Sequence, residues 1–383
     1  MKYAIKTKRL FDGEQWLEQH SIIIENGLVS QILANKELNS AVQRSTITAG
    51  IVAPGFIDLQ VNGGGGVMLS ASPCQETIET MTAAHRLGGT TSMMPTALSG
   101  TAANQKACVA AVRAAQKQGN FGVLGIHLEG PFFDEAKRGA HSADMIRALT
   151  ASDLTWLSTL NDLRVIVTLA PEHTQEGQIE FLSSTGIRIF AGHTNATYEQ
   201  LNKAANRGLC GFTHLFNAMS PLTGREPGAV GAALDNDKAW VGIIADNHHV
   251  HPVNIKLVQK IKPKGKLFLV TDAMATVGSD NSAFELYGET IEEQDGKLIN
   301  REGALAGSAI SMIEAVRIAN TMAGIPLEEV LRMASSYPAN VLGCDDQLGF
   351  IKPGYRADLV HFDESFKVHN TWVAGIAYDK RKN

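Results

Sequence analysis

Short apolar or β-branched runs alternate with helical patterns through the middle of the chain, from residue 51 to about residue 338. Most gaps between the runs carry apolar residues at helical spacing, as in residues 74–88, 102–118 and 253–261, and residues 308–323 continue this pattern after the last run. Eight strands alternating with helices predict an α/β fold, a (β/α)8 TIM-like barrel with functional residues at the carboxyl ends of its strands. The predicted strands are residues 56–61, 90–94, 122–128, 165–169, 187–191, 211–213, 241–245 and 267–271.

The two ends of the chain share a different pattern. Residues 3–11 and 20–34 alternate as short strands, and Asn26-Gly27 is a strong hairpin signal. Residues 348–363 and 369–379 have the same texture. We therefore expect both termini to build one small β-sandwich domain, from residues 1–53 and 346–383, with the barrel spanning residues 54–345.

The segment from residue 187 to residue 214 predicts a strand, a helix and a second strand, and each strand ends on a histidine, His193 or His214. A single histidine at such a position is more often a hydrogen-bonded structural residue. Two at equivalent strand ends meet at one edge of a parallel sheet, where side chains converge on a metal or a substrate. The pair therefore indicates a functional site.

Two acidic residues also end predicted strands. Glu129 follows an apolar run, and a carboxylate there costs free energy unless it is paired or coordinates a metal. With His193 and His214 it forms the mixed ligand set of catalytic zinc sites, against a structural salt bridge as the alternative. Asp272 ends the eighth run and is a candidate general base and acid, against a helix N-cap as the alternative.

Other polar residues are weaker candidates. His249 stands among three histidines and could stabilise an oxyanion, whereas His248 and His251 are expected at the surface or behind the site. Arg225, in a loop rich in Gly and Pro, is suited to bind phosphate, although a solvated arginine is the simpler interpretation. His141 could help to bind an anion. The glycine run 63–66 is followed by no Gly-Lys-Ser/Thr motif, so it predicts a rim loop or a close-approach turn.

Composition narrows the class of protein. The 383 residues are 44% hydrophobic and 19% charged, with a net charge of −5 and no basic run, which disfavours nucleic-acid binding. The four cysteines form no CxxC pair, so neither a thiolate zinc site nor a disulfide framework is expected. The sequence shows no secretion signal or membrane span, and a cytoplasmic location is expected.

Ten segments, in order from about Pro54 to Pro338, resemble the N-acetylglucosamine-6-phosphate deacetylases of the amidohydrolase superfamily. They are PGFIDLQVNGGGG, LGIHLEGPF, GAHS, VTLAPE, AGHTNAT, THLFNAM, TGREPG, IIADNHHV, LVTDA and LAGSAISM. The resemblance implies deacetylation of N-acetyl-D-glucosamine 6-phosphate to D-glucosamine 6-phosphate and acetate, in amino-sugar catabolism. It also implies one divalent metal per subunit, expected to be Zn²⁺ with Fe²⁺, Co²⁺ and Mn²⁺ as alternatives.

The resemblance assigns roles residue by residue. The metal ligands would be Glu129, His193 and His214, the acid/base would be Asp272, and His249 would contact the acetamide carbonyl. A homodimer or dimer-based oligomer is implied, with Arg225 near the subunit interface. The substrate-binding set would be Ala140, His141, Asn217, Ala218, Arg225, His249, Leu305, Ala306 and Gly307.

One departure from the superfamily concerns the metal count. Gln60 and Asn62 stand where many amidohydrolases carry an HxH pair, and the end of the fourth strand lacks the lysine that is carbamylated in binuclear relatives. One metal is therefore expected, with Gln60 and Asn62 as candidates to contact a second metal or water. Two alternatives stay open: a deacetylase of another sugar phosphate such as N-acetylgalactosamine 6-phosphate, and a non-catalytic barrel that binds a sugar phosphate.

Overall fold

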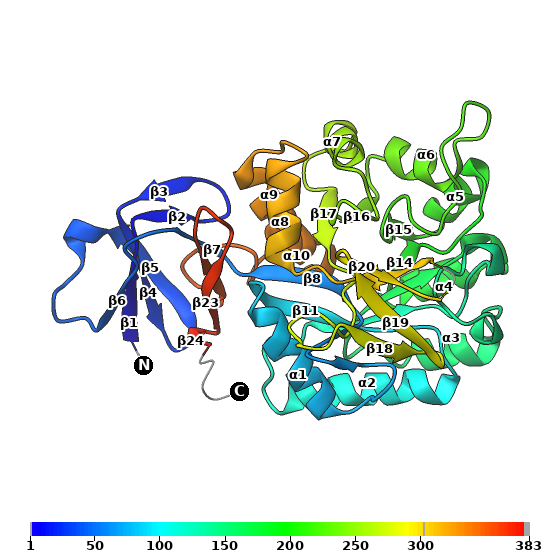
Figure 1. Ribbon diagram of the computed structural model, residues 1–383, viewed down its shortest axis with the longest axis horizontal. Coiled ribbons are helices and arrows are strands. Elements are labelled where there is room, and N and C mark those ends of the chain that lie inside the picture. Colours follow the sequence, from blue (N-terminus) through cyan, green and yellow to red (C-terminus); the bar gives the residue numbers. More distant parts are fainter. Residues whose placement is uncertain (1, 302, 379–383) are drawn as a thin grey trace.

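The computed structural model describes residues 2–301 and 303–378 and contains a parallel barrel beside a smaller all-β domain (Figure 1). Neighbouring barrel strands pair in chain order, which confirms the predicted (β/α)8 fold. The barrel closes where Val61 bridges to Ala273 and the Asp272 amide donates to the Gln60 carbonyl at 3.0 Å. The barrel strands are β8 (Phe56–Val61), β11 (Thr90–Ala97), β12 (Gly125–Glu129), β13 (Arg164–Leu169), β14 (Arg188–Ala191), β15 (Leu209–Phe212), β16 (Trp240–Ile244) and β17 (Leu267–Val270).

Helices follow the strands around the barrel, as the apolar spacing predicts. Local sequence sets several of their starts: Thr197 and Gln200 form a capping box at one helix, and Ser311 and Glu314 form another. The helices are α1 (Gln75–Arg86), α2 (Ala102–Lys117), α3 (Ala151–Leu157), α4 (Gln178–Ser184), α5 (Tyr198–Ala205), α6 (Gly228–Asp235), α7 (Pro252–Ile261), α8 (Met312–Thr321), α9 (Leu327–Met333) and α10 (Ser336–Leu342), with short 3-10 turns η1 (Asn35–Glu37), η2 (Glu135–Lys137), η3 (Ala143–Met145) and η4 (Pro171–His173).

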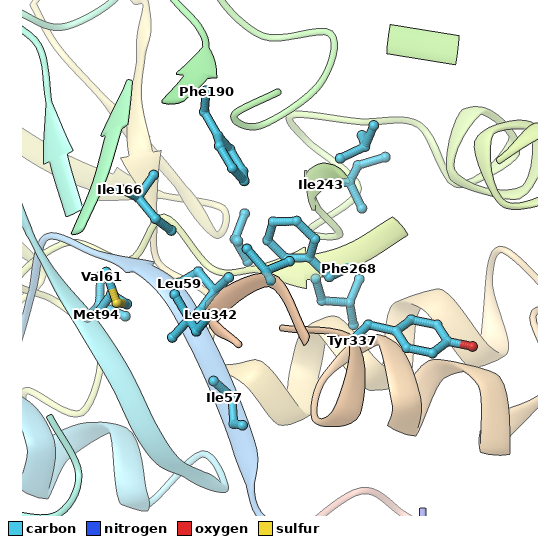
Figure 2. Close-up of a cluster of buried hydrophobic side chains, with 14 of the residues drawn as sticks. Ile57, Leu59, Val61, Met94, Ile166, Phe190, Ile243, Phe268, Tyr337 and Leu342 are labelled. Carbon is cyan, nitrogen blue, oxygen red and sulfur yellow. The ribbon is translucent and has the colours of Figure 1, made fainter. Parts of the chain in front are cut away.

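The barrel interior is filled by side chains. Figure 2 shows strand residues such as Leu59, Ile166 and Phe268 gathered in one cluster, with Tyr337 and Leu342 of α10 beside them. Leu59, Ile166 and Phe268 are each 1% exposed. Because the interior is packed, the strand ends are held rigidly, and functional side chains are available at the carboxyl rim.

Both chain ends build the small domain, which confirms the predicted sandwich. One sheet has the order β5-β4-β1-β6, and the other has the order β24-β23-β22-β7-β2-β3, so it joins the N-terminal and C-terminal strands. The domain borders at residues 53/54 and 345/346 stay predictions. The strands are β1 (Lys2–Lys6), β2 (Arg9–Phe11), β3 (Trp16–Glu18), β4 (His20–Glu25), β5 (Leu28–Ala34), β6 (Arg44–Thr46), β7 (Ile51–Pro54), β22 (Leu359–Phe362), β23 (Val368–Val373) and β24 (Ile376–Ala377).

Two local predictions about the small domain have different outcomes. Asn26 and Gly27 form the β4–β5 turn with φ of 53° and 83°, as the hairpin signal predicts. Residues 3–11, expected to be strand, do not form one continuous strand. The strand breaks after Lys6, because β1 and β2 belong to different sheets and the Thr7 hydroxyl accepts from the Arg9 amide at 3.2 Å.

A four-stranded antiparallel sheet between β17 and α8 was missed by the sequence analysis. Its strands are β18 (Ala283–Leu286), β19 (Glu289–Gln294), β20 (Lys297–Ile299) and β21 (Leu305–Ser308). Tyr287-Gly288 and Asp295-Gly296 turn its first two hairpins with positive φ, and such pairs are a readable hairpin signal. Leu286 and Leu298 of this sheet pack with Leu98 and Met274 at the barrel rim, so the sheet borders the site.

The glycine run forms a tight hairpin of β9 (Gly63–Gly64) and β10 (Val67–Met68), as expected for a close-approach turn. A Cβ at Gly63 would lie 2.5 Å from Met68 Sδ, and Gly65 and Gly66 have φ of 66° and 87°.

Among the described residues, no helix is both long enough and apolar enough to cross a membrane.

Candidate metal centre and active site

Three donor atoms converge at the carboxyl rim of the barrel. Glu129 ends β12, His193 follows β14 and His214 follows β15; the three residues are 2%, 4% and 3% exposed. Glu129 Oε1 lies 3.3 Å from His193 Nε2 and 3.2 Å from His214 Nε2, and the two ring nitrogens are 3.1 Å apart. In a tetrahedral zinc site with bonds of about 2.0–2.1 Å, ligand atoms are about 3.3 Å apart. The spacing therefore fits one metal ion.

The hydrogen bond behind His193 also fits a metal, whereas His214 Nδ1 is buried without a hydrogen-bond partner among the described residues. His193 Nδ1 contacts the Lys137 carbonyl at 2.9 Å, so Nδ1 carries the proton and Nε2 offers its lone pair. Burial by itself raises the pKa of Glu129, but its contacts with His193 and His214 outweigh burial and hold that pKa well below its usual range. The carboxylate is therefore charged and able to coordinate a cation.

Asp272 lies beside this centre and starts no helix, so the N-cap interpretation is wrong. Its neighbour Ala273 instead bridges to Val61 and Ser308. Asp272 Oδ1 accepts from Gln60 Nε2 at 3.0 Å and from Asn62 Nδ2 at 2.7 Å. Burial, with a contribution from the charge of Glu129, raises the pKa of Asp272 to about 6.

Gln60 and Asn62 donate hydrogen bonds to the buried carboxylates of the site in this structure. Besides Asp272, Gln60 Nε2 contacts Glu129 Oε1 at 2.8 Å, so one amide group bridges a metal-ligand candidate and the base candidate. Asn62 Oδ1 is buried without a hydrogen-bond partner in the described part of the chain. Contact of either residue with a second metal or with water stays a prediction.

His249 is oriented by a carboxylate. Its Nδ1 lies 2.6 Å from Asp246 Oδ2, and the other oxygen of Asp246 accepts from the amides of His248 and His249 at 2.8 Å. This leaves Nε2 of His249 as the ring nitrogen available to a substrate. His251 has a structural role, because its ring accepts from the Val253 amide at the start of α7.

One cavity contacts the metal-centre residues, Asp272 and His249 together. It brings together most of the predicted substrate residues, but Ala306 is fully buried beside it and does not line it. Arg225 lies on the exposed loop before α6 and is also absent from the lining. The lining residues are Leu98, Glu129, Gly139, Ala140, His141, His193, His214, Asn217, Ala218, His249, Asp272, Met274, Leu305 and Gly307.

His141 can bind an anion only as a neutral hydrogen-bond donor. Burial, followed by the neighbouring His193, lowers the pKa of His141 to about 3. Its Nδ1 accepts from the Ser99 amide at 3.3 Å, so the remaining proton sits on Nε2. Leu98, Gly139 and Met274 also line the cavity but were missed, because apolar residues and glycine carry no chemical signal. Only the places of Leu98 and Met274 shortly after strands, and of Gly139 next to Ala140, could have indicated them.

Three of the candidate metal-ligand and acid/base residues have backbone conformations that non-glycine residues rarely adopt. His193, His214 and Asp272 have φ of 50°, 33° and 54°. Each such conformation costs roughly 1–3 kcal/mol and persists only where surrounding contacts enforce it. The strain therefore lies where strand ends turn these side chains into the cavity.

A (β/α)8 barrel with a buried carboxylate and two histidines around one point is typical of metal-dependent amidohydrolases. Comparison of the sequence with protein families gives the same class. Residues 51–377 match the amidohydrolase family and residues 2–48 match the NagA composite domain. The chain therefore belongs to the amidohydrolase family, whose members are metal-dependent.

Individual relatives are more specific. The chain is 41% identical to the N-acetylgalactosamine-6-phosphate deacetylase of Shewanella sp. (strain ANA-3), over 86% of this chain and 83% of that protein. It is 34% identical to the N-acetylglucosamine-6-phosphate deacetylase of Haemophilus influenzae, over 98% and 99% of the two chains. The crystal structure of N-acetylglucosamine-6-phosphate deacetylase from Pasteurella multocida superposes with a TM-score of 0.96 at 37% identity, covering 99% of this chain and 100% of that one.

Proposed function

We propose that this protein hydrolyses N-acetyl-D-glucosamine 6-phosphate to D-glucosamine 6-phosphate and acetate. The observation that carries the proposal is that the convergent Glu129, His193 and His214 share one cavity with the buried carboxylate of Asp272. Two relatives that match nearly the whole chain are named as N-acetylglucosamine-6-phosphate deacetylases, which hydrolyse a C–N bond. A sensor would need the cavity but not a buried proton acceptor beside the metal centre.

The proposed cofactor is one Zn²⁺ ion held by Glu129, His193 and His214. When bound, the metal supplies Lewis acidity to the substrate carbonyl and promotes ionisation of a water molecule. Asp272 takes the proton of the attacking water and returns it to the leaving nitrogen. Nε2 of His249 faces the carbonyl oxygen and stabilises the charge that develops there.

The phosphate group is expected to bind across a subunit interface. No lysine or arginine of residues 2–301 and 303–378 lines the cavity, so a cationic partner for the phosphate would have to reach it from beyond this lining. Arg225 is exposed, and so is Leu222 on the same loop at 57%. We propose a homodimer in which Arg225 of one subunit reaches the cavity of the other.

The outer face of α7 supports this dimer. Val253, Leu257 and Ile261, spaced by four residues, are 54%, 49% and 52% exposed and form one apolar stripe. A second copy of the chain would cover such a stripe.

The proposed cellular location is the cytoplasm. All four cysteines are free, which fits this reducing compartment.

Metal removal tests the proposed reaction. Acetate release from N-acetylglucosamine 6-phosphate should fall to background after chelator treatment and return when one equivalent of Zn²⁺ per subunit is restored. Release is measured by an enzyme-coupled acetate assay, with Mg²⁺ as the control addition. Undiminished release from protein shown to be metal-free would contradict the metal role, and tight sugar-phosphate binding without release under any metal would favour the sensor.

N-acetylgalactosamine 6-phosphate is the second candidate substrate, because the Shewanella relative named for that sugar is 41% identical to this chain. The two sugars differ only in the configuration at C4. Comparison of kcat/KM for both with the zinc-loaded protein assigns the substrate: the higher value for the galacto sugar would replace the first proposal and leave the reaction class unchanged.

A further inference from the structure

The segment that carries His193 is held by contacts that do not involve the other two proposed metal ligands. His193 has a φ of 50°, a conformation that needs enforcement by its surroundings. The next two residues, Thr194 and Asn195, both bond to the carboxylate of Glu172. Glu172 lies on η4, in the loop that follows the neighbouring strand β13.

Glu172 uses both carboxylate oxygens on this segment. Oε2 accepts from the Thr194 hydroxyl at 2.5 Å, and Oε1 accepts from the Asn195 amide at 2.6 Å. Hydrogen bonds to a carboxylate are stronger than those between neutral groups, so these two contacts can help to enforce the strained backbone of the preceding His193. The Thr194 hydroxyl also accepts from the Ala196 amide at 3.1 Å, so the contact extends along the turn.

The other side of His193 is held from the loop after β12. The Asp134 amide donates to the His193 carbonyl at 2.9 Å, and the Phe133 ring stacks on the imidazole at a centroid distance of 4.2 Å. Asp134 Oδ2 also lies 2.8 Å from His173 Nε2, which links the loops after β12 and β13. The His193 segment is therefore held from two loops. The loop after β12 contacts the imidazole and the carbonyl of His193, and Glu172 in the loop after β13 holds the two residues that follow.

Asp134, Glu172 and His173 also place ligand-type atoms within 4.8 Å of one another. Their contacts favour a supporting network over a second metal site. Both oxygens of Glu172 are engaged by the His193 segment, and Asp134 Oδ1 accepts from the Ala136 amide while Oδ2 contacts His173. Protein donors thus already occupy the directions that a cation would need.

We infer that Glu172 is a positioning residue, which holds the backbone after β14 so that Nε2 of His193 is directed at the metal. This inference rests on the metal centre of the proposed function. Glu172 contacts neither the cavity nor the metal ligands, and it acts only through Thr194 and Asn195. Its loss should therefore weaken metal binding more than it affects the sugar-phosphate pocket.

The test is the Zn²⁺ dissociation constant of the full chain, measured by competition with a chromophoric chelator. Loss of a residue that orients a metal ligand typically costs about 10–100-fold in metal affinity, and Glu172→Ala should show a loss of this size. Glu172→Gln, which keeps one acceptor, should fall between it and the unaltered protein. At saturating Zn²⁺, kcat of Glu172→Ala should recover to within a few-fold, with an unchanged KM.

Glu176→Ala is the matched control, because Glu176 lies in the same loop but its side chain is 87% exposed and pairs with Arg207. It should bind Zn²⁺ as the unaltered protein does. Equal Zn²⁺ affinity of Glu172→Ala and the unaltered protein would overturn the inference, as would an equal loss in Glu176→Ala. If Glu172→Ala does not fold, the Zn²⁺ dissociation constant of Glu172→Gln is compared with that of the unaltered protein instead, and equal values would overturn the inference. Failure of the unaltered protein to bind Zn²⁺ would instead reject the proposed metal centre and the inference with it.

Discussion

Asp272→Asn should bind zinc and the sugar phosphate nearly as the unaltered protein does, but should lose about 10²–10⁴ in kcat. Asparagine matches aspartate in shape, and its side-chain oxygen can still accept from Gln60 Nε2 and Asn62 Nδ2, which contact Asp272 Oδ1 in this structure. The substitution therefore keeps the geometry and removes the proton acceptor. Acetate release gives kcat, and calorimetric titration of N-acetylglucosamine 6-phosphate into the zinc-loaded variant gives its affinity.

Asp58→Asn is the matched control for that experiment. Asp58 is a fully buried aspartate on the neighbouring strand β8. Its carboxyl accepts from the amides of Gln60 and Thr271 and from the Thr271 hydroxyl, and it does not line the cavity. Burial raises the pKa of Asp58 to about 7, so a neutral side chain is a close substitute near neutral pH. Asp58→Asn should keep kcat within a few-fold. Near-normal turnover of Asp272→Asn, or an equal loss in both variants, would contradict the role of Asp272.

The three residues of the candidate metal centre could be expected to converge from the sequence alone, because a barrel brings the carboxyl ends of its strands to one rim. Glu129 and His193 each follow a recognisable apolar run, and parallel strands bring the ends of such runs to one rim. The sequence could not place the side chains that support them. Glu172 was visible only as one more polar residue after a strand, and its two contacts depend on how adjacent loops fold over each other.

The missed β18–β21 sheet has a different cause. The pattern of alternating strands and helices accounts for the eighth strand and for the helix expected over residues 308–323. It assigns nothing to the residues between them, where the hairpin signals Tyr287-Gly288 and Asp295-Gly296 lie. The inserted sheet does not interrupt the alternation of barrel strands and helices. The count of eight barrel strands therefore does not indicate its presence. The sheet nevertheless supplies Leu305 and Gly307 to the cavity lining.

Arg225→Ala should raise KM for the sugar phosphate by about 10–100-fold with a smaller change in kcat. The phosphate lies away from the reacting amide, and a charge-assisted hydrogen bond to it is typically worth about 1.5–3 kcal/mol. Steady-state acetate release gives both constants. Arg207→Ala is the control, because Arg207 pairs with Glu176 and Glu180 and should leave KM unchanged. An unchanged KM in Arg225→Ala would remove this residue from the site.

Mixing two impaired variants distinguishes a shared site from a single-chain site. If Arg225 acts across the interface, a heterodimer of Arg225→Ala and Asp272→Asn subunits has one complete site, in which Asp272 comes from the first subunit and Arg225 from the second. Random exchange makes half of the dimers heterodimers, so the mixture should reach about a quarter of the unaltered activity at substrate concentrations below KM. If Arg225 serves its own subunit, every site in the mixture lacks one of the two groups, and mixing restores nothing. The exposed position of Arg225 outside the cavity of its own chain is the reason to expect the first result.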